Sequence, residues 1–187
     1  MTWIVLAAIA AALAAWGVSL YNGLVKRRNL AEEGWSGIDV QLKRRADLVP
    51  NLVETVKGYT THERELLENV TELRNQARAA PAGDVAARSQ IEGMLSGALG
   101  RLLAIVENYP ELKANQNFLA LQESLQGVEH DIQMARRYYN GATRDLNVMV
   151  ESFPSNLVAG WFGFGKKPFF EIEDAAAREA PKVSFPQ

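Results

Sequence analysis

The sequence contains no cysteine, only two histidines and almost no net charge. Without cysteine there can be no disulfide, no thiolate nucleophile and no lipoprotein-type acylated cysteine. The 20 basic and 22 acidic residues give a formal net charge of −2. Such a balance lacks the concentrated basic face that nucleic-acid binding requires, so we expect no nucleic acid partner. The length allows one domain plus an anchor.

Residues that could carry chemistry are sparse. His62 and Glu63 begin like a zinc-protease motif, but Leu66 stands where the second ligand would follow, and His130 has no ligand-spaced neighbour. No serine has a nucleophile-elbow context, and the segment 163–165 is too short for a phosphate-binding loop. We expect no enzymatic activity, no metal site and no cofactor.

The first 25 residues contain no ionisable side chain. A bilayer core of about 30 Å needs about 20 apolar helical residues, so residues 1–25 are predicted to form a transmembrane anchor with the lipid bilayer as partner. A cleavable signal peptide would have basic residues before a shorter apolar run. These two features favour a retained anchor, although Ala12 to Ala14 resembles a cleavage site.

Small residues recur at every fourth position of this span, at Ala7, Ala11, Ala15, Ser19 and Gly23. Such a stripe lets two helix backbones approach closely, and it predicts self-association in the membrane. The alternative is that an alanine-rich segment produces the stripe by chance.

Basic residues follow the span directly, at Lys26, Arg27 and Arg28, and only the amino terminus precedes it. The positive-inside rule then places the bulk of the chain in the cytoplasm.

An apolar heptad seam runs from residue 118 to residue 153 with alternating spacings of three and four. It predicts a long helix, Glu111–Ser152, packed against at least one other helix. Pro110 precedes this helix and Pro154 follows it. The seam positions are Phe118, Leu121, Leu125, Val128, Ile132, Ala135, Tyr139, Ala142, Leu146, Met149 and Phe153.

A second seam runs from residue 31 to residue 77, with Pro50 inside it as a predicted kink. A capping box of Thr60 and Glu63 would start a new helix after Gly58; without that break the first helix continues to about Arg78. The apolar seam positions are Ala31, Trp35, Ile38, Leu42, Val49, Leu52, Val56, Tyr59, Leu66, Val70, Leu73 and Ala77.

A third helix is predicted from Asp84, its N-cap, to Asn108, with a third apolar seam. Its seam positions are Ile91, Leu95, Ala98, Leu102 and Ile105. No stretch is typical of a strand, so the predicted fold is all-α: a transmembrane helix continuing into a bundle of long, coiled-coil-like antiparallel helices over residues 26–160.

The predicted helices differ in length. At 1.5 Å per residue the helix after Pro110 is about 63 Å long and the helix before it about 37 Å. The shorter helix cannot pack along the whole seam of the longer one, so either the first helix or another subunit must pack against the remainder. The second possibility motivates a homo-oligomer hypothesis.

Arg45 is a charged residue on an apolar seam. A buried arginine needs an acceptor and can fix helix register or partner choice, so we predict a role in register or assembly. Ligand binding and a solvated side chain remain the alternatives.

The C-terminal tail, residues 161–187, gathers five aromatic residues around Lys166 and Lys167 before an acidic end. They are Trp161, Phe162, Phe164, Phe169 and Phe170. The tail could fold back on the bundle, dock on another subunit or touch the membrane interface. The segment Glu171–Gln187 is expected to be extended.

Several motifs in order resemble the LemA family. They are Tyr21-Asn22, Trp35 to Val53, Val56 to Tyr59, Tyr109 to Asn115, Arg137 to Asn140, Phe153-Pro154, Gly163-Phe164 and Phe169 to Glu171. The resemblance implies a bacterial inner-membrane protein with a long-helix bundle and no assigned enzymatic activity. Some relatives are associated with magnetosome membranes, and some are encoded near membrane metalloproteases. Other relatives carry a lipoprotein cysteine where this chain has Leu20, which would place their domain outside the cytoplasm.

These observations favour a non-catalytic, self-associating membrane protein that acts as a scaffold or an envelope-organising component. The alternative is an adaptor that binds a membrane protein partner, such as a membrane protease.

Overall fold

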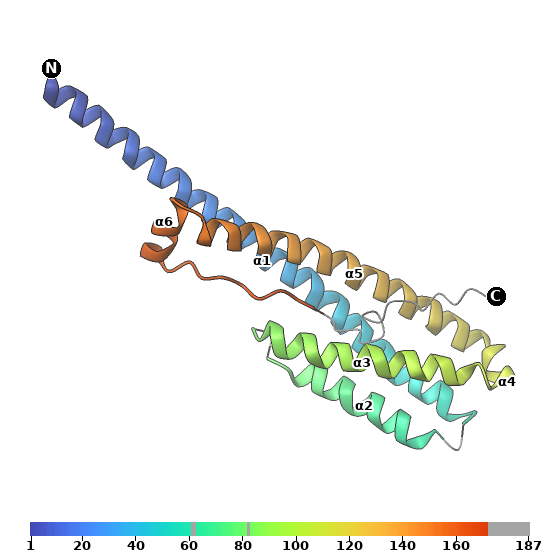
Figure 1. Cartoon of the computed structure of the whole chain (residues 1–187). Helices are drawn as coiled ribbons and strands as arrows, with labels where there is room; N and C mark the ends of the chain where they lie inside the picture. Colours follow the sequence, from blue (N-terminus) through green and yellow to red (C-terminus); the bar gives the residue numbers. More distant parts are fainter. Residues whose placement is uncertain (61–62, 82, 172–187) are drawn as a thin grey trace, which may run out of the picture. The chain divides into compact units, whose positions relative to one another are not determined.

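The computed structural model describes residues 1–60, 63–81 and 83–171, and these residues are arranged as helices without a strand (Figure 1). The prediction of an all-α fold is confirmed. The helices are α1 (Thr2–Lys57), α2 (Arg64–Ala79), α3 (Val85–Val106), α4 (Pro110–Lys113), α5 (Gln116–Glu151) and α6 (Ser155–Phe162).

Helix α1 is a single helix of 56 residues that includes Pro50. Every residue from Met1 to Trp16 is exposed, and Leu24 is the first fully buried residue. Within the described part of the chain, α1 is the one helix long and apolar enough to cross a membrane. The segment predicted as the anchor is therefore continuous with the part of α1 that packs against other helices of the chain.

The chain divides into two compact units. Unit 1 contains residues 1–40 and 131–169, and unit 2 contains residues 41–130 and the segment that begins at Phe170. Helices α1 and α5 contribute residues to both units. The sequence-based division into residues 1–25, 26–160 and 161–187 stays a prediction.

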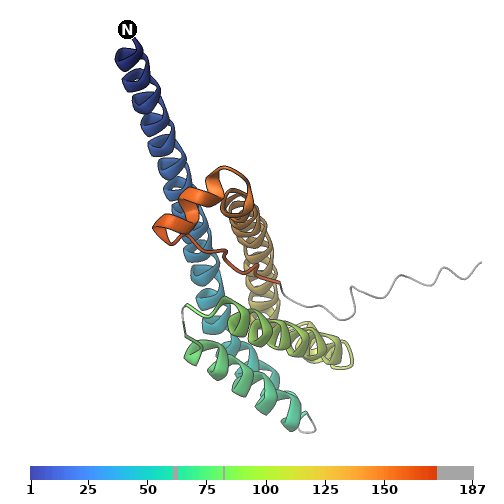
Figure 2. The same cartoon turned by 60° about the vertical axis from the view of Figure 1, so that its left-hand side comes forward.

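In unit 1, α1 and α5 pack against each other in antiparallel directions (Figures 1 and 2). Gly23 of α1 lies against Met149, whereas Gly34, eleven residues later, lies against Tyr139. A Cβ atom at Gly34 would be only 2.9 Å from the Cα of Tyr139. The backbones are therefore in close contact at a position where only glycine fits without movement.

Helix α6 follows the long helix and was not predicted. Its buried Ala159 packs with Leu24 and Leu146, and Ser155 Oγ donates a hydrogen bond of 2.7 Å to the Met149 carbonyl. The helix ends at Gly163, whose φ of 71° lies in the left-handed region that favours glycine.

The segment after Gly163 lies along α5. The Asn147 side chain accepts from the Lys167 amide and donates to its carbonyl, both at 2.9 Å. The Tyr139 hydroxyl donates to the Pro168 carbonyl at 2.8 Å. These bonds pair the backbone polar groups of an otherwise irregular segment.

In unit 2, residues from α1, α2, α3, α4 and α5 share one apolar core. α2 and α3 form a helical hairpin (Figure 1), and the predicted N-cap is confirmed because the Asp84 carboxylate accepts from the Ala87 amide at 3.0 Å. The buried core residues are Val49, Leu52, Val56, Leu67, Val70, Leu73, Ala77, Leu95, Ala98, Leu99, Leu102, Val106, Leu112, Phe118 and Leu125.

The first long helix does break near Gly58, but the predicted capping box is wrong. The Thr60 hydroxyl donates to the Val56 carbonyl at 3.2 Å, so its hydrogen bond is made to the last turn of α1 and not to the first turn of α2. Glu63 is the N-cap residue of α2 and makes no side-chain capping bond. The seam prediction also fails at Tyr59, which is 40% exposed beyond the end of α1.

The prediction of one helix over residues 111–152 is wrong at its start and correct to one residue at its end. A separate short helix, α4, comes first, and α5 begins after Asn115, whose side chain accepts from the amides of Asn117 and Phe118. These local hydrogen bonds compete with a continuous helix from α4, so α5 begins as a new helix after Asn115. At the other end Phe153, expected on the seam, is 79% exposed because α5 ends at Glu151.

The close contact at Gly34 gives a matched pair of variants. We expect Gly34→Ala to lower the free energy of unfolding by about 1–3 kcal/mol, because the added methyl group forces the two helices apart. Gly37→Ala, on the same helix with nothing near its Cβ position, should raise it by about 0.5–1 kcal/mol through helix propensity alone. Thermal and urea unfolding of the detergent-solubilised chain, followed by circular dichroism, measures both; equal effects at the two glycines would contradict the packing described.

Candidate functional site

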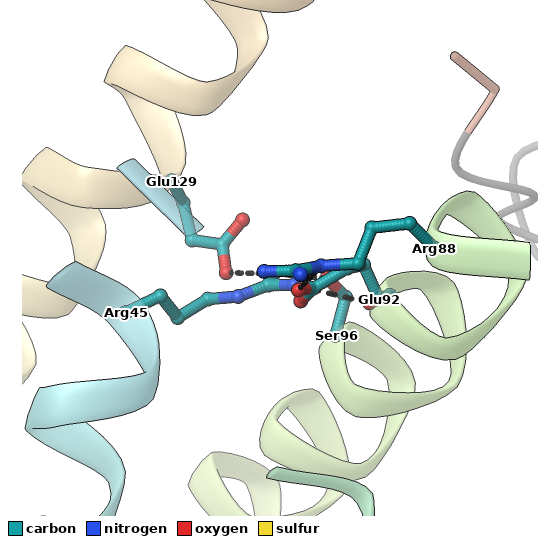
Figure 3. Close-up of polar contacts among 5 residues, drawn as sticks. All are labelled: Arg45, Arg88, Glu92, Ser96 and Glu129. Carbon is teal, nitrogen blue, oxygen red and sulfur yellow. Dashed lines mark hydrogen bonds and ion pairs between the residues drawn. The ribbon is translucent and has the colours of Figure 1, made fainter. Parts of the chain in front are cut away.

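Arg45 of α1 is fully buried in unit 2, and its guanidinium is held by residues of α3 and α5 (Figure 3). Nη1 donates to Ser96 Oγ at 2.5 Å and to Glu129 Oε1 at 2.7 Å. Nη2 donates to the Glu92 carbonyl at 3.2 Å and to the Glu92 carboxylate. One side chain therefore bonds residues of two other helices and joins three helices in all.

Glu92 is shared between two arginines. Its second carboxylate oxygen accepts from Arg88 Nε at 2.8 Å, across one turn of α3. The side chains of Glu92 and Arg88 are 1% and 6% exposed, whereas that of Glu129 is 33% exposed. Two guanidinium groups and two carboxylates balance in charge within this cluster, which we call the Arg45 cluster: Arg45, Arg88, Glu92, Ser96 and Glu129.

Burial and the neighbouring carboxylates shift the pKa of Arg45 in opposite directions. Loss of water favours the neutral guanidine, but the attraction and hydrogen bonds of Glu129 and Glu92 outweigh it and raise the pKa of Arg45 above its ordinary value. Arg45 is therefore a permanent positive charge in the interior. An interior charge of this kind is tolerated only while its carboxylate partners stay in place.

The geometry of the Arg45 cluster can align helices. Ser96 Oγ and Glu129 Oε1 both accept from Arg45 Nη1, and the described residues contain no group of three or more histidine, cysteine, aspartate and glutamate side chains that could hold a metal ion. Its bonds require Arg45, Glu92 and Glu129 to lie at one level of three helices. A shift of one helix by a turn would leave buried charges unpaired, which is strongly unfavourable.

The heptad pattern indicated Arg45 but not its partners. Three of the five predicted seam residues of the third helix, Leu95, Ala98 and Leu102, are buried as expected, whereas Ile91 and Ile105 are only partly buried. The line Arg88, Glu92, Leu95, Leu99 also has helical spacing, and its buried members include both charges. A seam drawn along that line would have found Glu92 as a second buried charge.

Four of the five residues of the small-residue stripe lie on the part of α1 that is exposed. Ala7, Ala11, Ala15 and Ser19 are exposed along the described helix. Gly23, by contrast, is covered by α5: a Cβ there would meet Met149 Cε at 3.3 Å. The last member of the stripe therefore serves packing inside the chain.

The aromatic residues of the tail separate into three groups. The rings of Phe162 and Phe164 contact Tyr21, with centroid distances of 4.8 and 5.7 Å. Phe170 is buried in unit 2. Trp161 and Phe169 are 87% and 42% exposed.

The remaining candidates for chemistry do not join the Arg45 cluster. His130 is exposed on α5, and His62 lies outside the described residues. Lys166 and Lys167 form ion pairs with Glu151 and Glu32 at 2.7 and 3.1 Å.

Comparison with known proteins identifies related sequences. A profile of the LemA family matches residues 34–185. Magnetosome proteins MamQ 1 and MamQ 2 of Paramagnetospirillum magneticum are each 24% identical to the chain, and the match covers 83% of this chain and 66% of each relative. Protein LemA of Metamycoplasma hominis is 25% identical, and the match covers 74% of this chain and 63% of that protein. The chain thus spans slightly less than two thirds of the length of these relatives.

Replacing Arg45 tests whether the cluster aligns the helices. Arg45→Leu leaves Glu129 without its cation and Glu92 with only one, so we expect unfolding free energy to fall by about 3–5 kcal/mol and the oligomer distribution to broaden. Arg44→Leu, the exposed neighbour on the same helix, should change stability by less than about 0.5 kcal/mol. Unfolding by circular dichroism and particle mass in detergent measure the two effects; if Arg45→Leu leaves both unchanged, the register role is excluded.

Proposed function

The chain belongs to the LemA family, and we propose that it is a non-catalytic, membrane-anchored helical protein that self-associates and acts as a scaffold or envelope-organising component. The observation that carries this proposal is α1, one helix that begins with an exposed apolar segment and later buries one face against other helices of the chain. Such a helix can continue from a membrane into a folded unit without a break.

The anchoring part of the proposal follows from the surface of α1. Large apolar side chains that include Ile4, Ile9 and Leu13 are more than half exposed. No other described helix covers them, and a helix pairs its own backbone groups, so a bilayer is the surrounding that stabilises this segment. The two relatives from Paramagnetospirillum magneticum are magnetosome proteins, which supports a membrane setting.

The proposed location is the bacterial inner membrane, with a single span and the bulk of the chain in the cytoplasm. Lys26, Arg27 and Arg28 follow the span, and positively charged residues next to a span favour the cytoplasmic side.

We propose that two chains associate through the exposed residues of the small-residue stripe. Ala7, Ala11 and Ala15 lie on one face of α1 and are exposed, so a second α1 can approach closely there. Packing between spans would then bring the folded parts of two chains close to each other. This arrangement suits a structural component that works in several copies.

Topology can be tested directly because the chain has no native cysteine. We expect a single cysteine at Met134, which is 51% exposed on α5, to resist a membrane-impermeant maleimide in intact spheroplasts and to react after lysis. Labelling before lysis would place the bulk of the chain outside the cytoplasm.

Cysteine crosslinking tests the association face. Ala11→Cys should form disulfide-linked dimers in membranes treated with a mild oxidant, whereas Leu13→Cys, two residues away on a different face of the helix, should not. Equal crosslinking at both positions would show random collision and remove the stripe from the proposal.

Co-purification separates the scaffold from an adaptor. The scaffold predicts that mass photometry of the wild-type chain in native-lipid nanodiscs finds oligomers that contain this chain alone. A stoichiometric second membrane protein, for example a protease, would favour the adaptor instead.

A further inference from the structure

Helix α6 has two faces with opposite properties. On one face, Ala159 and the partly buried Val158 pack against the cluster that contains Leu24. On the other, Leu157 and Trp161, four residues apart, are 63% and 87% exposed. Phe153, just before α6, is 79% exposed, and no residue of α6 is charged.

The exposed face is therefore an apolar surface without a partner inside the described chain. Exposed apolar side chains are common singly, but contiguous ones usually mark an interaction site. The large residues of this surface are Phe153, Leu157 and Trp161. Apolar surroundings would stabilise these side chains, and the position of α6 along α1 indicates that these surroundings are a bilayer.

Unit 1 fixes the level of α6 on α1. The Phe162 ring is 4.8 Å from the ring of Tyr21, and Ala159 packs against Leu24. Tyr21 lies 19 residues after Thr2, which is roughly 28 Å at 1.5 Å per residue. The hydrocarbon core of a bilayer is about 30 Å thick, so a span that begins near Thr2 leaves the hydrocarbon close to Tyr21. The contacts of Phe162 and Ala159 hold α6 at that level, and Figure 2 shows α6, coloured orange, beside α1.

The surroundings of α6 also match the bilayer interface. Aromatic side chains are enriched where hydrocarbon meets headgroups, and basic side chains are favoured next to the phosphates. Arg28 lies 5.3 Å from the centre of the Phe164 ring, and Lys26 and Arg27 precede it on the same turn. Apolar side chains and cations are thus combined at one end of unit 1.

We propose that α6 lies in the interfacial layer of the bilayer, with Phe153, Leu157 and Trp161 inserted among the upper acyl chains, as a second membrane contact beside the span. The inference rests on the proposed anchor. A span alone leaves unit 1 free to rotate about the helix axis and to tilt. A second contact fixes one face of unit 1 against the membrane.

Tryptophan fluorescence in nanodiscs tests this insertion. Two single-tryptophan chains are made by changing the others to phenylalanine, so that one keeps Trp161 and the other keeps Trp16. Brominated lipids quench tryptophan only on contact. We expect Trp161 to be quenched most strongly by bromine near the glycerol backbone and Trp16 by bromine along the acyl chain.

Matched controls distinguish insertion into lipid from burial against protein. A chain whose only tryptophan replaces Met134, exposed on α5 of the same unit but far along α5 from α6, should not be quenched by any lipid. The pair Phe153→Gln and Leu157→Gln, added to the Trp161 chain, should reduce its quenching and shift its emission to longer wavelength, because the apolar face is lost.

The outcomes distinguish the two proposals. If Trp16 is quenched and Trp161 is not, the anchor stands and the interfacial position of α6 is wrong. A short-wavelength Trp161 emission without quenching would assign the face to a second copy of the chain and overturn the inference. If neither tryptophan is quenched, the anchor itself fails, and the inference fails with it.

Discussion

The continuity of α1 is the constraint on which the rest of the structure depends. A single helical register places Ile9 on the exposed apolar segment, Leu24 and Gly34 against α5 in unit 1, and Arg45 beside the acidic residues of unit 2. Because a helix turns by a fixed angle per residue, an insertion of one residue would rotate every later side chain to another face. The exposed segment and the packed segments of α1 therefore share one helical register.

Two kinds of interaction maintain this register, one in each unit. In unit 1 it is shape: the missing side chain of Gly34 lets the backbone of α5 approach, and no larger residue fits without a shift. In unit 2 it is charge: Arg45 is stable in the interior only opposite Glu92 and Glu129. A contact of either kind discriminates between helix registers more sharply than apolar packing, which tolerates sliding and exchange of similar side chains.

Much of this fold could be predicted from spacing alone, because long seams carry a strong periodic signal. The seams placed Leu42, Val49 and Ile132 in the interior correctly. They could not give the end of a helix that depends on a side-chain bond, as at Asn115, or a helix of eight residues such as α6, which is too short to show a period. They marked Arg45 as unusual but not its partners, because a heptad fixes the face on which a residue lies and not the residue it meets. The partners became visible only when α3 was placed beside α1.

The central claim is that one helix passes from lipid into protein, and electron paramagnetic resonance can test it along that helix. Nitroxide labels on single cysteines from Ile4 to Ile38 report collisions with oxygen, which concentrates in lipid, and with a water-soluble nickel complex. A continuous helix predicts high oxygen and low nickel accessibility from Ile4 to Leu20. Beyond Lys26, nickel accessibility should rise with a helical period, with minima at the buried Ala31 and Ile38. Nickel accessibility that is already high from Ile4 to Leu20, or a loss of the helical period between Leu20 and Ala31, would contradict the claim.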